Sequence, residues 1–203
     1  MSPFDGSVVT VAIPSIASTI HLSLEGAVWI PLAYLLLLTV LLINAGRLAD
    51  LHGRKRFYLL GFATFTISSI LCGISTTDLQ LVLFRALQGT GAAFIAANST
   101  AIVTDAFPRE GRGRALGINT MAVYIGLMVG PVLGGVLVQN FGWRSIFFVN
   151  VPIGILVITL GALKLRQNPP NALGVNFDFP GAATLSAGLA SSLVVLTLGG
   201  TYG

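Results

Sequence analysis

Seven long apolar blocks, separated by short polar connections, occupy most of this chain. An apolar helix of about 20 residues is long enough to cross the hydrocarbon core of a bilayer. Backbone groups in lipid have no water to bond, so each spanning segment must pair them internally, as a helix does. The alternating pattern of membrane β-barrels does not occur in the sequence. The sequence therefore predicts an all-α membrane protein with spans over Ser7–Ile20, Ala27–Gly46, Phe57–Ser75, Leu79–Thr104, Ala115–Val138, Ser145–Leu163 and Phe179–Gly199.

Composition supports the membrane class. Hydrophobic residues make up 54% of the 203 residues and charged residues only 9%, whereas soluble domains carry about 25% charged residues. The net charge of +4 does not indicate nucleic-acid binding, because the basic residues lie between apolar blocks rather than on one face. The single cysteine, Cys72, excludes a disulfide or zinc framework, and no phosphate-binding loop motif is present. We expect no enzyme, and no bound metal or cofactor.

The basic residues predict the orientation of the spans. Cytoplasmic connections of membrane proteins carry an excess of lysine and arginine. Here the connections after the second, fourth and sixth blocks hold almost all of the eleven basic residues, and the opposite connections hold only Arg144. Odd-numbered spans are therefore expected to run outward from the cytoplasm. We expect a multi-pass protein of the plasma membrane, which in a bacterium is the inner membrane. The cytoplasmic set is Arg47, Arg54, Lys55, Arg56, Arg109, Arg112, Arg114, Lys164 and Arg166.

We expect three parts along the chain. Residues 1–163 form a six-helix unit, residues 164–178 a polar, proline-rich cytoplasmic linker, and residues 179–203 a seventh transmembrane helix with its outer end. Only four residues precede Asp5, so we interpret the first span as truncated. The seventh span has no closing partner helix, which predicts a missing C-terminal half of the same protein as a partner.

Two ionisable residues lie within apolar blocks, Asp5 and Arg85. A charge in a spanning helix is costly and is by default a functional hypothesis. Asp5 is either a membrane carboxylate that can bind a proton or a solvated helix start, and Arg85 either faces a cavity or snorkels to the surface. Counting 1.5 Å per residue from the outer helix ends, the two differ in depth by roughly 10 Å or more. A direct ion pair therefore cannot be assumed from the sequence.

Further polar residues are possible cavity-lining positions, although hydrogen bonds between helices would explain them equally well: Gln88, Tyr34, Asn119 and Tyr124. In the fifth block, Gly126, Gly130 and Gly134 recur every four residues and would line one helix face, so that a neighbouring helix can approach closely. Pro131 removes a backbone donor and is expected to bend this helix.

The connection after the second block combines Asp50 with Gly53 and a run of basic residues. Basic residues at a cytoplasmic edge are expected from topology, but the acidic residue at the helix end is not. We expect a tight turn at Gly53 and an ion-pair network around Asp50.

Five segments together resemble the major facilitator superfamily, in its fourteen-span drug:proton antiporter branch: Phe4–Pro14, Gly46–Arg56, Leu83–Ala93, Gly126–Gly135 and Trp143–Gly154. The resemblance implies the six-helix N-terminal bundle of that fold, with the seventh helix as an extra span between two halves. It implies that Asp5 is a proton or cationic-substrate site and that Arg85 influences proton coupling. It also implies a bending, close-packed interface formed by Gly126, Gly130, Pro131, Gly134 and Gly135, and a conformational latch formed by Gly46, Asp50, Gly53, Arg54, Lys55 and Arg56.

The resemblance predicts a secondary transporter that exports small, apolar or cationic, drug-like compounds in exchange for protons by alternating access. Its expected partners are the small-molecule substrate, protons and the lipid bilayer. An importer or exporter of one metabolite on the same fold remains an alternative, as does a purely structural role for this segment. A retinal protein is disfavoured, because it needs a membrane lysine late in the chain and no lysine follows Lys164.

Overall fold

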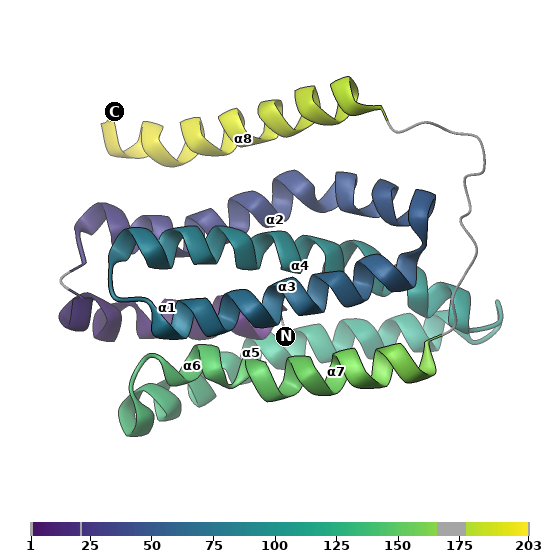
Figure 1. Cartoon of the computed structure of the whole chain (residues 1–203), viewed down its shortest axis with the longest axis horizontal. Helices are drawn as coiled ribbons and strands as arrows, with labels where there is room; N and C mark the ends of the chain where they lie inside the picture. The colour runs from purple at the N-terminus through teal and green to yellow at the C-terminus, as the bar shows by residue number, and fades with distance from the viewer. Residues whose placement is uncertain (1, 21, 166–177, 203) are drawn as a thin grey trace.

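The structure is a computed structural model that describes residues 2–20, 22–165 and 178–202. Within these ranges the chain is a helical bundle without β-strands (Figure 1), as the apolar blocks predict. The helices are α1 (Ser2–Ile20), α2 (Leu24–His52), α3 (Arg54–Ile74), α4 (Asp78–Ala106), α5 (Arg112–Phe141), α6 (Ser145–Phe148), α7 (Asn150–Lys164) and α8 (Phe179–Tyr202).

Each predicted span except the sixth falls on one helix, with Ser75 just after the end of α3, and most helices extend a few residues beyond the apolar block. In the described part of the chain, six helical segments are long and apolar enough to cross a membrane, and α8 contributes a shorter apolar stretch, Pro180–Val195. The sixth of these segments, Ser145–Lys164, contains both α6 and α7. The interruption at Val149 has a local cause, because Pro152 has no N–H to donate to the carbonyl of Phe148 four residues earlier.

The predicted connection Gly46–Arg56 is helical almost throughout, which corrects the sequence-based boundary. Helix α2 continues to His52 and α3 begins at Arg54, so that Gly53 alone separates them. The apolar pattern ends at Gly46, but a helix has no reason to stop where it leaves the hydrocarbon. It stops where a residue adopts another conformation, and Gly53 has a φ of 104°, which glycine adopts without steric cost.

Helix α4 lies between α2 and α3, and close packing on both sides depends on glycines. A Cβ at Gly89 would clash with the backbone carbonyl of Tyr34 on α2. A Cβ at Gly91 would lie 2.7 Å from the backbone nitrogen of Phe65 and 2.8 Å from the oxygen of Gly61, both on α3. Helix α1 packs on α5, α7 packs on α3, and α8 lies along α2, where Asn44 donates a hydrogen bond to Ser186 (Figure 1).

The cytoplasmic ends predicted from the basic residues lie together. The ends of α2, α4 and α7 and the starts of α3 and α5 are at the same end of the bundle (Figure 1). Hydrogen bonds between these ends, described below, support the same arrangement. Of the predicted linker 164–178, residues 166–177 lie outside the described part of the structure.

Candidate functional site

Asp5 and Arg85 form a direct ion pair inside the bundle. Nη1 of Arg85 donates to Oδ2 of Asp5 at 2.5 Å, and the two residues are only 1% and 2% exposed, respectively. The predicted difference in depth between them is therefore wrong. That prediction placed the outer ends of all helices at one height, whereas the end of α1 reaches further along the bundle than the start of α4 (Figure 1).

Three further polar side chains complete the cluster around Asp5. Gln88, one turn after Arg85 on α4, donates to Oδ1 of Asp5 at 3.0 Å and accepts from Nη1 of Arg85 at 2.6 Å. Asn150, the first residue of α7, donates to the same Oδ1 at 2.8 Å. Ser69 on α3 accepts from Gln88 at 2.8 Å. Asp5 thus accepts three hydrogen bonds, and the cluster joins α1, α3, α4 and α7.

Helix α2 and the short helix α6 close the site around the guanidinium group. The Arg85 guanidinium carbon lies 4.3 Å from the centroid of the Tyr34 ring and 6.0 Å from that of Phe147. Nε of Arg85 also donates to the carbonyl of Ile30 at 3.5 Å. Aromatic faces attract a cation, most strongly when it is desolvated. Arg85 is therefore held by a carboxylate on one side and by aromatic rings on the other.

The site brings together a carboxyl group and a permanent positive charge. A carboxylate that accepts hydrogen bonds and faces a cation is stabilised in its ionised form, whereas burial favours the protonated form. Arginine stays protonated in proteins. Movement of Arg85 relative to Asp5 would therefore change how readily Asp5 binds a proton, and protonation of Asp5 would leave the Arg85 charge without its counter-ion.

Tyr34 and Gln88, predicted as possible cavity-lining residues, are buried within this cluster and are 2% and 0% exposed. The other two predicted positions lie elsewhere. Asn119 on α5 accepts a hydrogen bond from Ser99 on α4 at 3.4 Å, and Tyr124 is exposed on α5. Sequence reasoning missed Ser69, Phe147 and Asn150 as partners of the pair. Asn150 had a weak signal, since it lies within Trp143–Gly154, one of the five segments that resemble the superfamily.

The glycine face of α5 packs against α1 next to Asp5. A Cβ at Gly126 would lie 3.6 Å from Cβ of Phe4, one at Gly130 would clash with the Ser7 side chain, and one at Gly134 would lie 2.9 Å from Val8. The predicted close approach of a neighbouring helix is thus present, and the neighbour is α1. Gly135 has no atom within 4 Å of such a Cβ, and Pro131 is exposed, so neither belongs to this contact.

A second cluster lies at the cytoplasmic end. Nε of Arg54 donates to Asp50 and Nη1 to Asp105 of α4, each at 2.8 Å. Nζ of Lys55 donates to the carbonyls of Ala162 and Leu165, at the end of α7. These contacts connect the ends of α2, α3, α4 and α7 and confirm an ion-pair network around Asp50.

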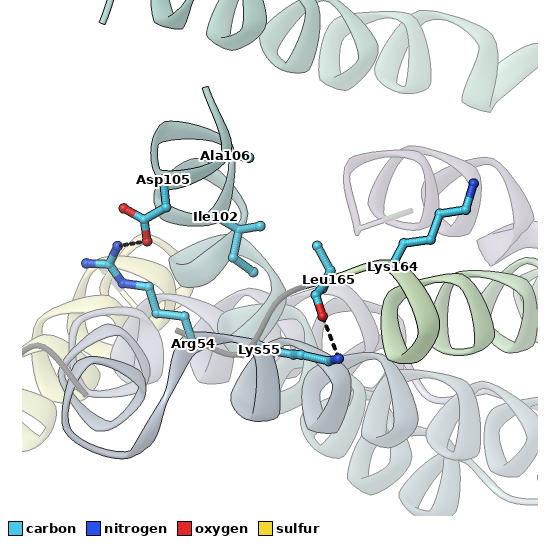
Figure 2. A pocket seen from close by; sticks show the side chains of 7 residues that line it. All are labelled: Arg54, Lys55, Ile102, Asp105, Ala106, Lys164 and Leu165. Atoms are coloured by element: carbon cyan, nitrogen blue, oxygen red, sulfur yellow. Dashed lines mark hydrogen bonds and ion pairs between the residues drawn. The ribbon is translucent and has the colours of Figure 1, made fainter. Parts of the chain in front are cut away.

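A cavity of about 330 Å³ lies beside this cluster. Figure 2 shows the side chains that line it, with Arg54 turned toward Asp105 and Lys55 toward Leu165. Arg54 and Lys55 are thus already engaged by protein acceptors. Gly53 forms the predicted tight turn, and Arg56 is exposed. A Cβ at Gly46 would lie 3.8 Å from Cβ of Ala97 on α4, so this position has room for a larger residue. The arrangement fits a set of helix-end contacts better than a ligand site.

Curated relatives of this chain are transporters. It is 37% identical to the riboflavin transporter RibZ of Clostridioides difficile over 98% of the chain and 43% of the relative. It is 43% identical to the multidrug resistance protein Stp of Mycobacterium tuberculosis over 87% of the chain and 33% of the relative. It is 41% identical to the cephamycin export protein CmcT of Amycolatopsis lactamdurans over 97% of the chain and 40% of the relative. The chain therefore spans less than half the length of these relatives.

Solved structures give the same fold. The chain is similar to a bacterial homologue of the lysosomal transporter Spinster, in its inward-facing and occupied conformation, with a TM-score of 0.73 and 26% identity. The alignment covers 88% of this chain and 44% of that one. The model of the Major Facilitator Superfamily matches residues 1–200. Given that match and these relatives, the chain belongs to the major facilitator superfamily.

Proposed function

We propose that this chain is the N-terminal half of a transporter in the bacterial plasma membrane that exports small, apolar or cationic, drug-like compounds in exchange for protons. The observation that carries the proposal is the buried pair of Asp5 and Arg85. A charge pair inside a membrane bundle costs desolvation energy that two apolar side chains would avoid. Its retention is explained if one of the two groups changes its charge during the transport cycle.

Asp5 is the group that can change. When Asp5 binds a proton, its attraction for Arg85 falls, and the guanidinium group keeps the Gln88 amide, the Ile30 carbonyl and the rings of Tyr34 and Phe147. Because Arg85 is on α4, the loss of the ion pair weakens the contact of α1 with α4. In an alternating-access transporter, such a change would favour one of two conformations.

The second half of the transporter has a surface to pack on. Helix α5 buries its glycine face against α1, but most of its other side chains are exposed, including Met128 at 78% and Val132 at 68%. An exposed apolar surface of this extent suits lipid or another helix bundle. We assign part of it to the C-terminal half, and assign Gly46, Asp50, Gly53, Arg54, Lys55 and Arg56 to a latch that stabilises one conformation at the cytoplasmic end.

The proton gradient is large enough for this task. One proton that crosses a potential of 100 mV releases about 2.3 kcal/mol, and a tenfold concentration ratio corresponds to about 1.4 kcal/mol. Exchange of one proton for one neutral molecule would therefore hold a concentration ratio of roughly 50.

The test uses the complete transporter that contains this chain, in inverted membrane vesicles with a fluorescent cationic dye in the medium, so that export appears as dye uptake into the vesicles. A pH gradient should drive dye transport, and Asp5→Asn should abolish the response to the gradient. Glu110→Gln, which neutralises an exposed carboxylate in the α4–α5 connection, is the matched control and should transport as the wild type does. A rate of dye transport that changes neither with the pH gradient nor with Asp5→Asn would contradict the proposal.

A second candidate is transport of one specific metabolite, which the similarity to RibZ over 98% of the chain favours. The two candidate functions predict different competition between transported compounds. A drug exporter should move several unrelated dyes, and each should compete with the others. A metabolite transporter should move riboflavin or a compound of that class and leave the dyes unmoved. Measuring riboflavin and dye fluxes in the same vesicles decides between them.

A further inference from the structure

Of the three side chains that donate hydrogen bonds to Asp5, the Asn150 side chain has the fewest other polar partners among the described residues. It is 0% exposed and begins α7 directly after the interruption at Val149. Its Nδ2 donates to Oδ1 of Asp5 at 2.8 Å. Among the described residues, its Oδ1 accepts no hydrogen bond. The Asn150 amide thus contributes one polar contact, and that contact is to Asp5.

Gln88 has the same chemistry but more partners. Its Nε2 donates to both Asp5 and Ser69, and its Oε1 accepts from Arg85 and lies 3.8 Å from Sγ of Cys72. Replacing Gln88 would disturb several contacts at once. Replacing Asn150 removes one donor from Asp5 and leaves the contacts of Arg85 in place.

Titratable groups near Asp5 come from α2, α3 and α4. Arg85 on α4 is the cation, Cys72 on α3 lies behind Gln88, and Tyr34 on α2 lies behind Arg85. Helix α5 meets α1 through the glycines at 126, 130 and 134, which bring no charge. Asn150 is thus the neutral donor that α7 contributes to this set.

We propose that Asn150 is a positioning residue that sets the pH at which Asp5 takes up a proton. A donor to the carboxylate favours the ionised form, so Asn150 favours proton release. Hydrogen bonds to charged groups contribute enough that loss of one should raise the proton affinity of Asp5 about tenfold, a shift of about one pH unit. This inference rests on the proposed role of Asp5, but its test measures the protonation of the Asp5 carboxyl group and not dye export.

The experiment is an infrared difference titration of the complete transporter in lipid, with Asp5→Asn as the reference that identifies the Asp5 carboxyl band. Asn150→Ala should move the half-titration point of that band about one pH unit upward, and Asn150→Ser, which keeps a donor, should stay closer to the wild type. Asn98→Ala is the matched control. Asn98 is similarly buried, at 1% exposed, and its Nδ2 donates within α4 to the carbonyl of Phe94 at 2.8 Å.

If Asn150→Ala does not fold, Asn150→Asp replaces it, because aspartate has the same shape as asparagine and exchanges the donor for an acceptor. Its spectrum is read against the double variant with Asp5→Asn, and an upward shift is again expected. No shift beyond that of Asn98→Ala, or a downward shift, would overturn the inference. An upward shift with dye export that ignores the pH gradient would support Asn150 as positioning residue and contradict the proposed function.

Discussion

Removing only one charge of the Asp5–Arg85 pair should destabilise the protein more than removing both. Asp5→Asn leaves a guanidinium group that is 1% exposed and cannot lose its proton. Breaking a buried pair in this way costs about 3–5 kcal/mol, whereas replacing both partners by neutral groups is often close to neutral. Gln88, Ile30 and Tyr34 still contact Arg85, so we expect the lower end, about 3 kcal/mol.

Arg85→Met should behave differently, because Asp5 can bind a proton and lose its charge. At high pH the carboxylate would keep only the donors Gln88 and Asn150. Burial without a cation favours the protonated form in the folded state. The free energy of unfolding of Arg85→Met should therefore approach that of the wild type at low pH and fall as the pH rises. Asp5→Asn should show no such recovery.

The assay is denaturant unfolding of the complete transporter in detergent micelles, for the two single variants and for the double variant Asp5→Asn with Arg85→Met. The double variant should be at least about 2 kcal/mol more stable than Asp5→Asn, because it leaves no unpaired buried charge. Additive losses, with the double variant less stable than either single variant, would refute the reasoning, since they would mean that the two charges do not compensate each other.

Two further predictions test packing and the cytoplasmic cluster. Gly91→Ala should cost about 1–3 kcal/mol in the same unfolding assay, because the new Cβ meets backbone atoms of Phe65 and Gly61 that cannot move aside; Gly117→Ala, on an exposed face of α5 with no atom nearby, is the control and should cost nothing. Arg54→Ala should lower the free energy of unfolding by at most about 1 kcal/mol, since its ion pairs are partly exposed. The same variant should slow dye export in vesicles. Unchanged export would show that Arg54 is not part of the latch.

The spans and their direction could be predicted from the sequence because both depend on composition along the chain. Spans follow from the length of apolar blocks and direction from the basic residues between them. The division of the sixth span depends on Pro152 near the start of its block, which leaves the carbonyl of Phe148 without its helical donor. The end of α2 was misplaced because the apolar pattern marks the hydrocarbon boundary rather than the residue at which the helix ends.

The site could be predicted only in part. Asp5 and Arg85 stand out because charges are rare in spanning helices, but their contact depends on the relative depth and rotation of α1 and α4. Helices that are apolar on all sides carry no periodic pattern that would reveal that rotation. Ser69 and Asn150 are uncharged and therefore had no comparable signal. Their part in the cluster follows from the packing of α3 and α7 against α4 and α1.

The two polar clusters share two helices, and this limits how a conformational change can proceed. Helix α4 carries Arg85 in the buried cluster and Asp105 in the cytoplasmic one. Helix α7 begins with Asn150 at Asp5 and ends beside the carbonyls that bind Lys55. A helix transmits a shift along its axis with little loss, because close-packed side chains resist compression. If protonation of Asp5 moves α4 or α7 relative to α1, the cytoplasmic contacts of Arg54 or Lys55 must then lengthen or be replaced by contacts with other partners. Under the proposed function, proton binding and latch release would therefore be two consequences of one helix movement.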